Sequence, residues 1–151
     1  MLDGATIEVS EAAADADRAA ILNALAAFNA DTGYPAHVLP VAVLLKDAQG
    51  HTIGGLWGKT VYDWMFVAYL VVPEAMRGHD YGTLLMREAE AVAIARGCVG
   101  AWLTTFNFQA QGFYERLGYE VFGELERSPG DCVRIFMRKM FADERDSIAQ
   151  V

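Results

Sequence analysis

The stretch LVVPEAMRGHDYGT, residues 70–83, joins an apolar run to an amphipathic segment through a proline and two glycines. The first N–H groups of a helix have no partner within the helix, and the helix dipole places partial positive charge there. Gly78 and Gly82 allow the backbone to approach an anion closely, and Arg77 adds a fixed positive charge. The stretch therefore predicts a strand, an anion-holding loop and a helix, although an ordinary strand-to-helix connection uses the same residue types.

The composition is that of one folded domain. The chain has 151 residues, of which 54% are hydrophobic, and only four prolines. A chain of this length buries roughly two-thirds of the surface that its unfolded state exposes. We therefore predict a single domain over residues 1–141, followed by a polar C-terminal tail over residues 142–151.

The net charge and the N-terminal stretch indicate which kinds of partner the protein binds. The formal net charge is −8 and no run of basic residues is present, so nucleic-acid binding is not expected, whereas a cationic small molecule would be attracted. The N-terminal stretch lacks a basic start followed by an apolar core, and no apolar run is long enough to span a membrane. We expect a cytoplasmic location and no membrane partner.

The cysteines and histidines give no sign of a metal site. Cys98 and Cys132 are the two cysteines, and they lie in strand-like surroundings, so reduced and buried thiols are expected, with a disulfide as the alternative. His37, His51 and His79 show no ligand spacing relative to one another or to the cysteines. We predict no metal cofactor.

Hydrophobic periodicity predicts seven strands and three helices. The strands are expected at residues 5–9, 38–45, 52–57, 64–72, 99–105, 119–125 and 132–139. The helices are expected at residues 15–29, 82–96 and 108–117, the last one capped by Asn107. Gly54 and Gly55 inside a strand predict a bulge or a close backbone approach. The pattern indicates an α/β fold of the mixed α+β type, in which helices pack on a mixed sheet.

The short helix carries a second candidate feature. Asn107, Ala110 and Tyr114 follow one another at i, i+3 and i+7, so an amide, a small residue and a phenol would share one face, next to an inward-packing Phe113. This face could form a polar slot. The alternative is a capping asparagine together with a tyrosine whose hydroxyl lies in water.

Two separate segments of the chain resemble segments of one protein family. The run VVPEAMRGHDYGTLL, residues 71–85, is similar to the coenzyme A loop of the GCN5-related N-acetyltransferases (GNAT), and WLTTFNFQAQGFYERLGY, residues 102–119, is similar to their next segment. The likeness spans about residues 64–139. It implies a GNAT-like acyl-CoA N-acyltransferase fold with a mixed, mostly antiparallel sheet of about seven strands. It also implies direct transfer of the acetyl group of acetyl-CoA to a primary amine.

The resemblance further implies which residues bind acetyl-CoA, the expected co-substrate. Backbone N–H groups of the loop would hold its pyrophosphate, while the end of the preceding strand and Asn107 would contact its pantetheine arm. Tyr114 would lie near its sulfur. The implied binding residues are Leu70, Val71, Val72, Arg77, Gly78, His79, Asp80, Tyr81, Gly82, Thr83, Asn107, Ala110, Phe113 and Tyr114.

Asp80 departs from the family pattern, which has a glycine at this position. Aspartate tolerates left-handed backbone angles and can cap a helix, so the turn can survive the change. Its carboxylate is nevertheless a like charge near a diphosphate. We expect the carboxylate to point outward, offset by Arg77 and His79, and to lower the affinity for the coenzyme.

Tyr114 is the candidate catalytic residue, as the general acid that protonates the departing thiolate. The N–H of Val71 or Val72 is expected, by resemblance, to polarise the thioester carbonyl. Residues 64–72 contain no carboxylate or histidine, so the general base is left open. The candidates are a water chain and the carboxylates of Asp31, Asp63 and Glu124.

Other functions and the acceptor stay open. A non-catalytic acyl-CoA-binding or sensor module on the same fold would explain Asp80 and the missing base, whereas a nucleotide enzyme is disfavoured because the loop lacks the G-x-x-x-x-G-K-[ST] spacing. The net charge favours a small cationic amine as acceptor, with protein lysines or N-termini as alternatives. Candidates for lining an acceptor pocket are Tyr34, His37, Trp57, Tyr62 and Trp64. Dimers are common in the resembled family, so a homodimer is also left open.

Overall fold

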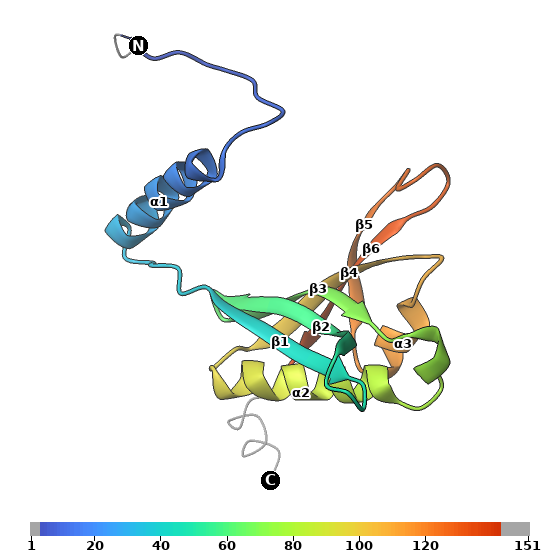
Figure 1. Ribbon diagram of the computed structural model, residues 1–151. Helices are drawn as coiled ribbons and strands as arrows, with labels where there is room; N and C mark the ends of the chain where they lie inside the picture. The colour runs from blue at the N-terminus through green and yellow to red at the C-terminus, as the bar shows by residue number, and fades with distance from the viewer. Residues whose placement is uncertain (1–3, 143–151) are drawn as a thin grey trace. The chain divides into compact units, whose positions relative to one another are not determined.

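The computed structural model describes residues 4–142, which fall into two compact units (Figure 1). The first unit ends at Ala36 and contains the helix α1 (Asp15–Asp31). The Asp17 carboxylate accepts a hydrogen bond from the Ala14 N–H at 3.0 Å and so fixes the start of this helix. The second unit begins at His37. The predicted tail at residues 142–151 lies outside the described residues apart from Ala142, and the single domain over residues 1–141 stays a prediction.

The second unit is built on a six-stranded sheet with the order β1-β2-β3-β4-β6-β5. Every neighbouring pair is antiparallel except β3 and β4, which are parallel. The predicted mixed, mostly antiparallel sheet is therefore confirmed. The strands are β1 (Leu39–Lys46), β2 (Thr52–Val61), β3 (Trp64–Val71), β4 (Gly100–Phe106), β5 (Glu120–Leu125) and β6 (Arg134–Met140).

The prediction of a seventh strand at residues 5–9 was wrong, because these residues form no strand. The alternation of apolar and polar residues there covers only a few positions. A strand obtains its hydrogen bonds from a neighbouring strand, and a short alternation does not specify that neighbour.

Two helices and one helical turn complete the second unit. These elements are η1 (Glu74–Met76), α2 (Tyr81–Ala95) and α3 (Gln111–Arg116). The prediction of a longer third helix capped by Asn107 was wrong, since the residue at the cap position is Ala110. The reason is that Asn107 continues the pairing of β4 with β6: its N–H donates to the Val133 carbonyl at 3.0 Å, and its Oδ1 accepts from the Val133 N–H at 3.1 Å.

The core lies between α2 and one face of the sheet. In Figure 1, α2 runs along the sheet across several strands. It buries side chains at helical spacing against alternating positions of the strands. The helix contributes Leu85, Met86, Ala89 and Ala93, and the sheet contributes Val41, Leu56, Met65, Val67, Ala101, Leu103, Ile135 and Met137.

Polar contacts fix α2 to the sheet at two points along its length. The buried Glu90 carboxylate accepts from Lys139 Nζ on β6 at 2.8 and 3.0 Å. Beyond the last helical residue, the Arg96 guanidinium donates to the Thr60 hydroxyl at 3.1 Å and to the Pro40 carbonyl at 2.9 Å. A buried carboxylate without its cation would be costly. These contacts therefore fix the C-terminal half of α2 to the sheet.

The glycine at position 58 allows β2 to lie close to β3. A Cβ added at Gly58 would collide with the Phe66 carbonyl oxygen. We predict that Gly58→Ala lowers the free energy of unfolding by about 1–3 kcal/mol, because the two backbones would have to separate. Urea denaturation measures this change.

Gly112→Ala is the matched control, because a Cβ at Gly112 would meet nothing closer than the end of the Arg116 side chain at 3.5 Å. Alanine is the better helix former, so this variant should be as stable as the wild type or more stable. Equal unfolding free energies for Gly58→Ala and the wild type would contradict the close approach of β2 and β3.

Candidate functional site

An extra residue in β3 opens the sheet at its centre. The pairing of β2 with β3 shifts between Trp57, which faces Tyr69, and Gly58, which faces Val67, so Ala68 has no opposite residue on β2. The parallel pairing of β3 with β4 ends at the same place, at Val67. An extra residue of this kind bends its strand and interrupts the ladder. Beyond Val67 the strands β3 and β4 therefore separate, and the N–H and C=O groups of β3 on that side lose their partners in the sheet.

The predicted close approach at the glycine pair is confirmed. A Cβ at Gly54 would lie 2.5 Å from the Val71 carbonyl oxygen, and Gly55 has a φ of +139°. The shift in the pairing of β2 with β3 lies further along β2, after Trp57. The glycine pair thus holds the end of β3 against β2 while β3 leaves β4.

The predicted loop joins this opening to α2. Gly78 (φ 81°) and Asp80 (φ 63°) have left-handed backbone angles, which place the N–H groups of the first turn of α2 at the mouth of the loop. Arg77 Nε donates to the Val72 carbonyl at 3.1 Å, so the guanidinium is held beside the loop. Asp80 occupies the cap position of α2, but its side chain makes no capping hydrogen bond.

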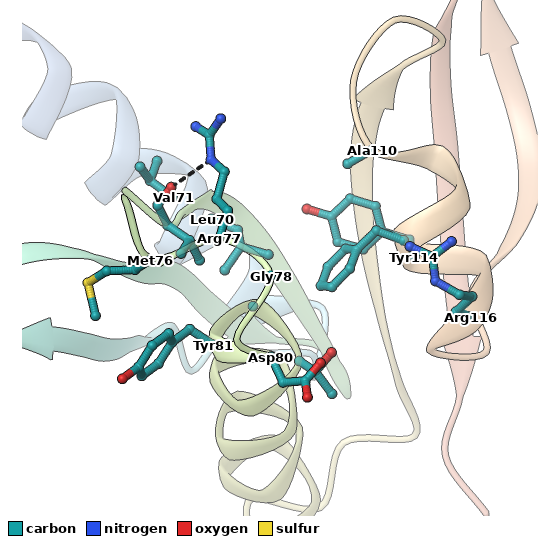
Figure 2. Close-up of a pocket in the computed structure, with 14 residues that line it drawn as sticks. Leu70, Val71, Met76, Arg77, Gly78, Asp80, Tyr81, Ala110, Tyr114 and Arg116 are labelled. Atoms are coloured by element: carbon teal, nitrogen blue, oxygen red, sulfur yellow. Dashed lines mark hydrogen bonds between the residues drawn. The ribbon is translucent and has the colours of Figure 1, made fainter. Parts of the chain in front are cut away.

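A cavity of about 560 Å³ lies between the end of β3, the loop and α3, and we call it the loop cavity (Figure 2). All the predicted coenzyme-binding residues line it except His79 and Asn107. Met76 and Arg116 also line it and were missed from the sequence. The residues that line the loop cavity are Leu70, Val71, Val72, Met76, Arg77, Gly78, Asp80, Tyr81, Gly82, Thr83, Ala110, Phe113, Tyr114 and Arg116. Their binding role stays a prediction.

The expected polar slot of Asn107, Ala110 and Tyr114 does not form, because Asn107 precedes α3 and its side-chain oxygen is bonded to Val133. Ala110 and Tyr114 do line the loop cavity together. The ring of Tyr114 is buried, while its side chain lines both this cavity and the gap between β3 and β4. The alternative of a tyrosine whose hydroxyl lies in water therefore stays open.

Tyr114 is placed to meet a group that enters from the loop. Figure 2 shows its ring extending from α3 toward the end of β3. The ring packs edge-on against Phe113 and Tyr119, with centroids 5.0 and 6.0 Å apart. Burial raises the pKa of the Tyr114 phenol above its ordinary value near 10. The phenol therefore keeps its proton at neutral pH and can donate it.

A second cavity, of about 760 Å³, follows the gap between β3 and β4, and we call it the splay cavity. It shares Leu70, Val71, Arg77, Ala110 and Tyr114 with the loop cavity. Its other lining residues are Val67, Ala68, Tyr69, Leu103, Thr104, Thr105, Phe106, Gln109 and Arg134. The two cavities therefore meet at Tyr114 and the end of β3, which gives two reactants one place to meet.

Two of the candidate bases, Asp63 and Glu124, do not lie at this point, since they line neither cavity. A third, Asp31, belongs to the first compact unit. Among the described residues that line the splay cavity there is no carboxylate and no histidine. The general base is therefore still unassigned, and a water chain stays among the candidates.

Of the residues expected to line an acceptor pocket, Tyr62 and Trp64 line a separate cavity of about 530 Å³ near the start of β3. His37 and Trp57 line none of the three cavities described. Tyr34 belongs to the first compact unit.

The two cysteines are free and half-buried, which confirms unpaired thiols but not full burial. Burial and the nearby Asp63 carboxylate raise the pKa of the Cys98 thiol, partly offset by Arg96. A raised pKa disfavours the thiolate, which is the nucleophilic form. Within residues 4–142, no three His, Cys, Asp or Glu side chains form a group that could hold a metal ion. None of the helices in this part of the chain has the length and apolar character needed to cross a membrane.

Comparison with known proteins decides the family. The sequence pattern of the Acetyltransferase (GNAT) family matches residues 10–119, which is more than half of the chain. The chain belongs to the GNAT family. The match includes β3, the loop, α2 and α3, which supply the residues that line the loop cavity.

Individual relatives share this segment. Acetyltransferase Atu2258 of Agrobacterium fabrum is 40% identical over 83 residues, which cover 55% of this chain and 61% of that protein, so less than two-thirds of that relative is spanned. Blasticidin-S acetyltransferase of Streptomyces morookaense is 38% identical over 94 residues, which cover 61% of this chain and 69% of that protein. A crystal structure from Agrobacterium tumefaciens, provisionally assigned as an acetyltransferase, has a TM-score of 0.85 and 31% identity, and covers 91% of this chain and 100% of that chain. Other structures of this fold hold coenzyme A or acetyl-CoA.

Two arginines were missed for different reasons. Arg116 follows Tyr114 by two positions in the predicted short helix, and its charge next to the predicted site was a usable signal. Arg134 comes from β6, whose place beside β4 depends on strand order. Local hydrophobic periodicity predicts strands but not their order in the sheet, so no sequence signal pointed to Arg134.

We predict that the two buried tyrosines make the protein sensitive to alkali. Burial raises the pKa of Tyr114, and burial together with the Glu90 carboxylate raises the pKa of Tyr119 by more. An unfolded chain releases these protons near pH 10, whereas the folded chain retains them, so the unfolding free energy falls as the pH rises above about 10. Urea denaturation across pH 8–11 should show a shallower fall for Tyr119→Phe than for the wild type, with Tyr114→Phe between the two. Identical slopes for all three proteins would contradict the raised pKa values.

Proposed function

We propose that the protein is an N-acetyltransferase that transfers the acetyl group of acetyl-CoA directly to a primary amine of a small molecule. The single observation that carries the proposal is the meeting of the two cavities beside Tyr114. One cavity begins at a loop and helix start of the kind that holds a diphosphate, and the other has room for a second reactant. Membership of the GNAT family supports the same reaction.

The loop cavity suits the coenzyme from end to end. The N–H groups of the first turn of α2 and the guanidiniums of Arg77 and Arg116 would hold the phosphates. Nothing lies within 4 Å of a Cβ placed on Gly78, so the loop leaves open space there. The Val71 carbonyl oxygen points toward Gly54 of β2, so the backbone groups of the neighbouring Leu70 face the gap on the side of β4. These groups of Leu70 would bond the pantetheine arm. Acetyl-CoA supplies the activated acetyl group.

Tyr114 is proposed as the general acid. A thiolate that leaves the thioester needs a proton, and the neutral phenol of Tyr114, whose pKa burial raises, can supply it. An N–H of the separated part of β3, that of Val71 or Val72, is proposed to stabilise the negative charge that develops on the carbonyl oxygen. The amine loses its proton to solvent or to a water chain, because the described lining offers no carboxylate for this task.

The acceptor is proposed to be a small amine that reaches the site as a cation, since the net charge of −8 would attract it over long range. The relative from Streptomyces morookaense is named for blasticidin S, so this compound belongs in any panel of test amines. Cytoplasmic location, the absence of nucleic-acid and membrane partners, and homodimer formation remain predictions from the sequence.

Ligand binding and turnover together test the proposed function. Acetyl-CoA should raise the unfolding temperature in a concentration-dependent manner, as linkage requires, whereas ATP at the same concentration should have a smaller effect. Thiol release from acetyl-CoA should then depend on an added amine. Stabilisation without thiol release for any amine would favour a non-catalytic acyl-CoA sensor. No stabilisation at millimolar acetyl-CoA would contradict both functions.

Tyr114→Phe should lower kcat by roughly 10²–10⁴-fold, which is the usual contribution of a general acid. Its KM for acetyl-CoA should stay within a few-fold of the wild type, because the ring remains in place. Tyr119→Phe is the matched control: Tyr119 is also a buried tyrosine, but it lines neither cavity and its hydroxyl points to Glu90. Full kcat in Tyr114→Phe would remove this residue from the proposed role.

Asp80→Asn should strengthen coenzyme binding. Asparagine tolerates the left-handed angle as well as aspartate does, and no capping bond is lost. Removal of one exposed charge near a diphosphate is worth about 1 kcal/mol in water, so the Kd for coenzyme A should fall by about fivefold at low salt. Glu74→Gln is the control, since Glu74 is an exposed carboxylate in η1 that lines neither cavity. An unchanged Kd in Asp80→Asn, measured by calorimetry, would show that the carboxylate does not act on the phosphates.

A further inference from the structure

The splay cavity carries positive charge, in contrast to the molecule as a whole. Arg77 and Arg134 are the charged side chains among the described residues that line it. Arg77 also lines the loop cavity, where the diphosphate is proposed to bind. Arg134 lines the splay cavity and not the loop cavity. Its charge is therefore available to the acceptor rather than to the coenzyme.

Arg134 is held in one orientation by its neighbours on β4. Its Nε and Nη2 donate to the Thr104 hydroxyl oxygen at 3.2 and 3.1 Å. Its Cζ lies 5.3 Å from the centre of the Phe106 ring, directly across the strand pair. Arg134 is an exposed side chain, and the hydroxyl and the aromatic ring restrict its guanidinium before any ligand arrives, which favours binding.

The hydrogen-bonding capacity of Arg134 is only partly used. Two of the five N–H donors of its guanidinium bond to Thr104, which leaves three. Within residues 4–142, the ion pairs of the structure join Asp47 to His51, Glu120 to Arg138, and Glu90 to Lys139, and Arg134 is in none of them. A planar guanidinium with free donors and no carboxylate partner matches the geometry of a carboxylate ligand.

We propose that Arg134 binds a carboxylate of the acceptor, so that the substrate class is an amine that also carries a carboxylate, such as an amino acid. This inference rests on the proposed function, because it assumes that the splay cavity holds the acceptor. At long range the net charge of −8 attracts such a molecule only where it keeps a net positive charge, as a diamino acid does, whereas Arg134 acts at contact distance on its acid end. Arg134 is thus a specificity-determining residue, and it takes no part in the proton transfers.

Matched pairs of acceptors test this directly. Thiol release is measured at saturating acetyl-CoA with α- and ω-amino acids, each paired with its carboxamide, and with aminoalkyl phosphates of similar length. For the acid that fits best, the wild type should show a kcat/KM about 10- to 100-fold above that of its amide, as expected for a charge-assisted hydrogen bond. Aminoalkyl phosphates as the better substrates would contradict the choice of a carboxylate.

Substitution of the arginine separates specificity from stability. In Arg134→Gln the kcat/KM for the acid divided by the kcat/KM for its amide should fall to about one. The change should come from a raised KM for the acid, while the kcat for the amide stays at its wild-type value. Arg134→Lys should recover part of this preference for the acid, because lysine restores the positive charge but not the paired N–H donors of a guanidinium. Arg138→Gln is the matched control, since Arg138 lies on the same strand but pairs with Glu120 at 3.6 Å and lines the separate cavity near the start of β3. It should leave the ratio unchanged.

The outcomes distinguish this inference from the proposed function. Equal kcat/KM values for acids and amides in the wild type, or a ratio that survives Arg134→Gln, would overturn the carboxylate site while the acetyltransferase stands. A lower unfolding temperature in Arg134→Gln, together with equal losses of kcat/KM for acid and amide, would show that Arg134 only stabilises the packing of β4 and β6. That result would also overturn the carboxylate site. If no amine of any class releases thiol, the proposed function fails and the substrate class fails with it.

Discussion

The site depends on one extra residue in a central strand. Ala68 has no opposite residue on β2, and the parallel pairing of β3 with β4 ends at the adjacent Val67. A pair of parallel strands that stayed bonded to their ends would leave neither a gap nor unpaired N–H groups. The interruption provides both, at the centre of the sheet and next to a helix start. The loop cavity and the splay cavity both include the segment of β3 that follows it.

The rest of the second unit holds this opening in shape. The glycines of β2 keep its backbone close to the end of β3, and the ion pair of Glu90 with Lys139 ties α2 to β6. Tyr119 packs behind Tyr114 and places its hydroxyl 3.4 Å from the same Glu90 carboxylate. The proposed acid thus packs against a tyrosine whose hydroxyl contacts Glu90 of α2, the helix that begins at the proposed phosphate loop.

The sequence predicted what is local and missed what depends on strand order. The apolar run, the loop around Gly78 and the helix that follows are encoded by periodicity and turn residues, and the structure has them close to the predicted bounds. The role of Asn107 in pairing with Val133 and the arrival of Arg134 beside Thr104 both require β6 to lie next to β4. The bulge at Ala68 leaves no mark in the sequence, because no glycine or proline lies within residues 64–72.

Hydrogen–deuterium exchange of the backbone amides with and without coenzyme A tests the central claim most directly, because it reports which N–H groups the ligand protects. The account predicts slower exchange in the segment of β3 after Ala68, in the loop and first turn of α2, and in α3, with unchanged exchange in β1 and in the part of β3 before Val67. Protection confined to other strands, or equal protection along the whole of β3, would contradict a site built on the interruption of the sheet.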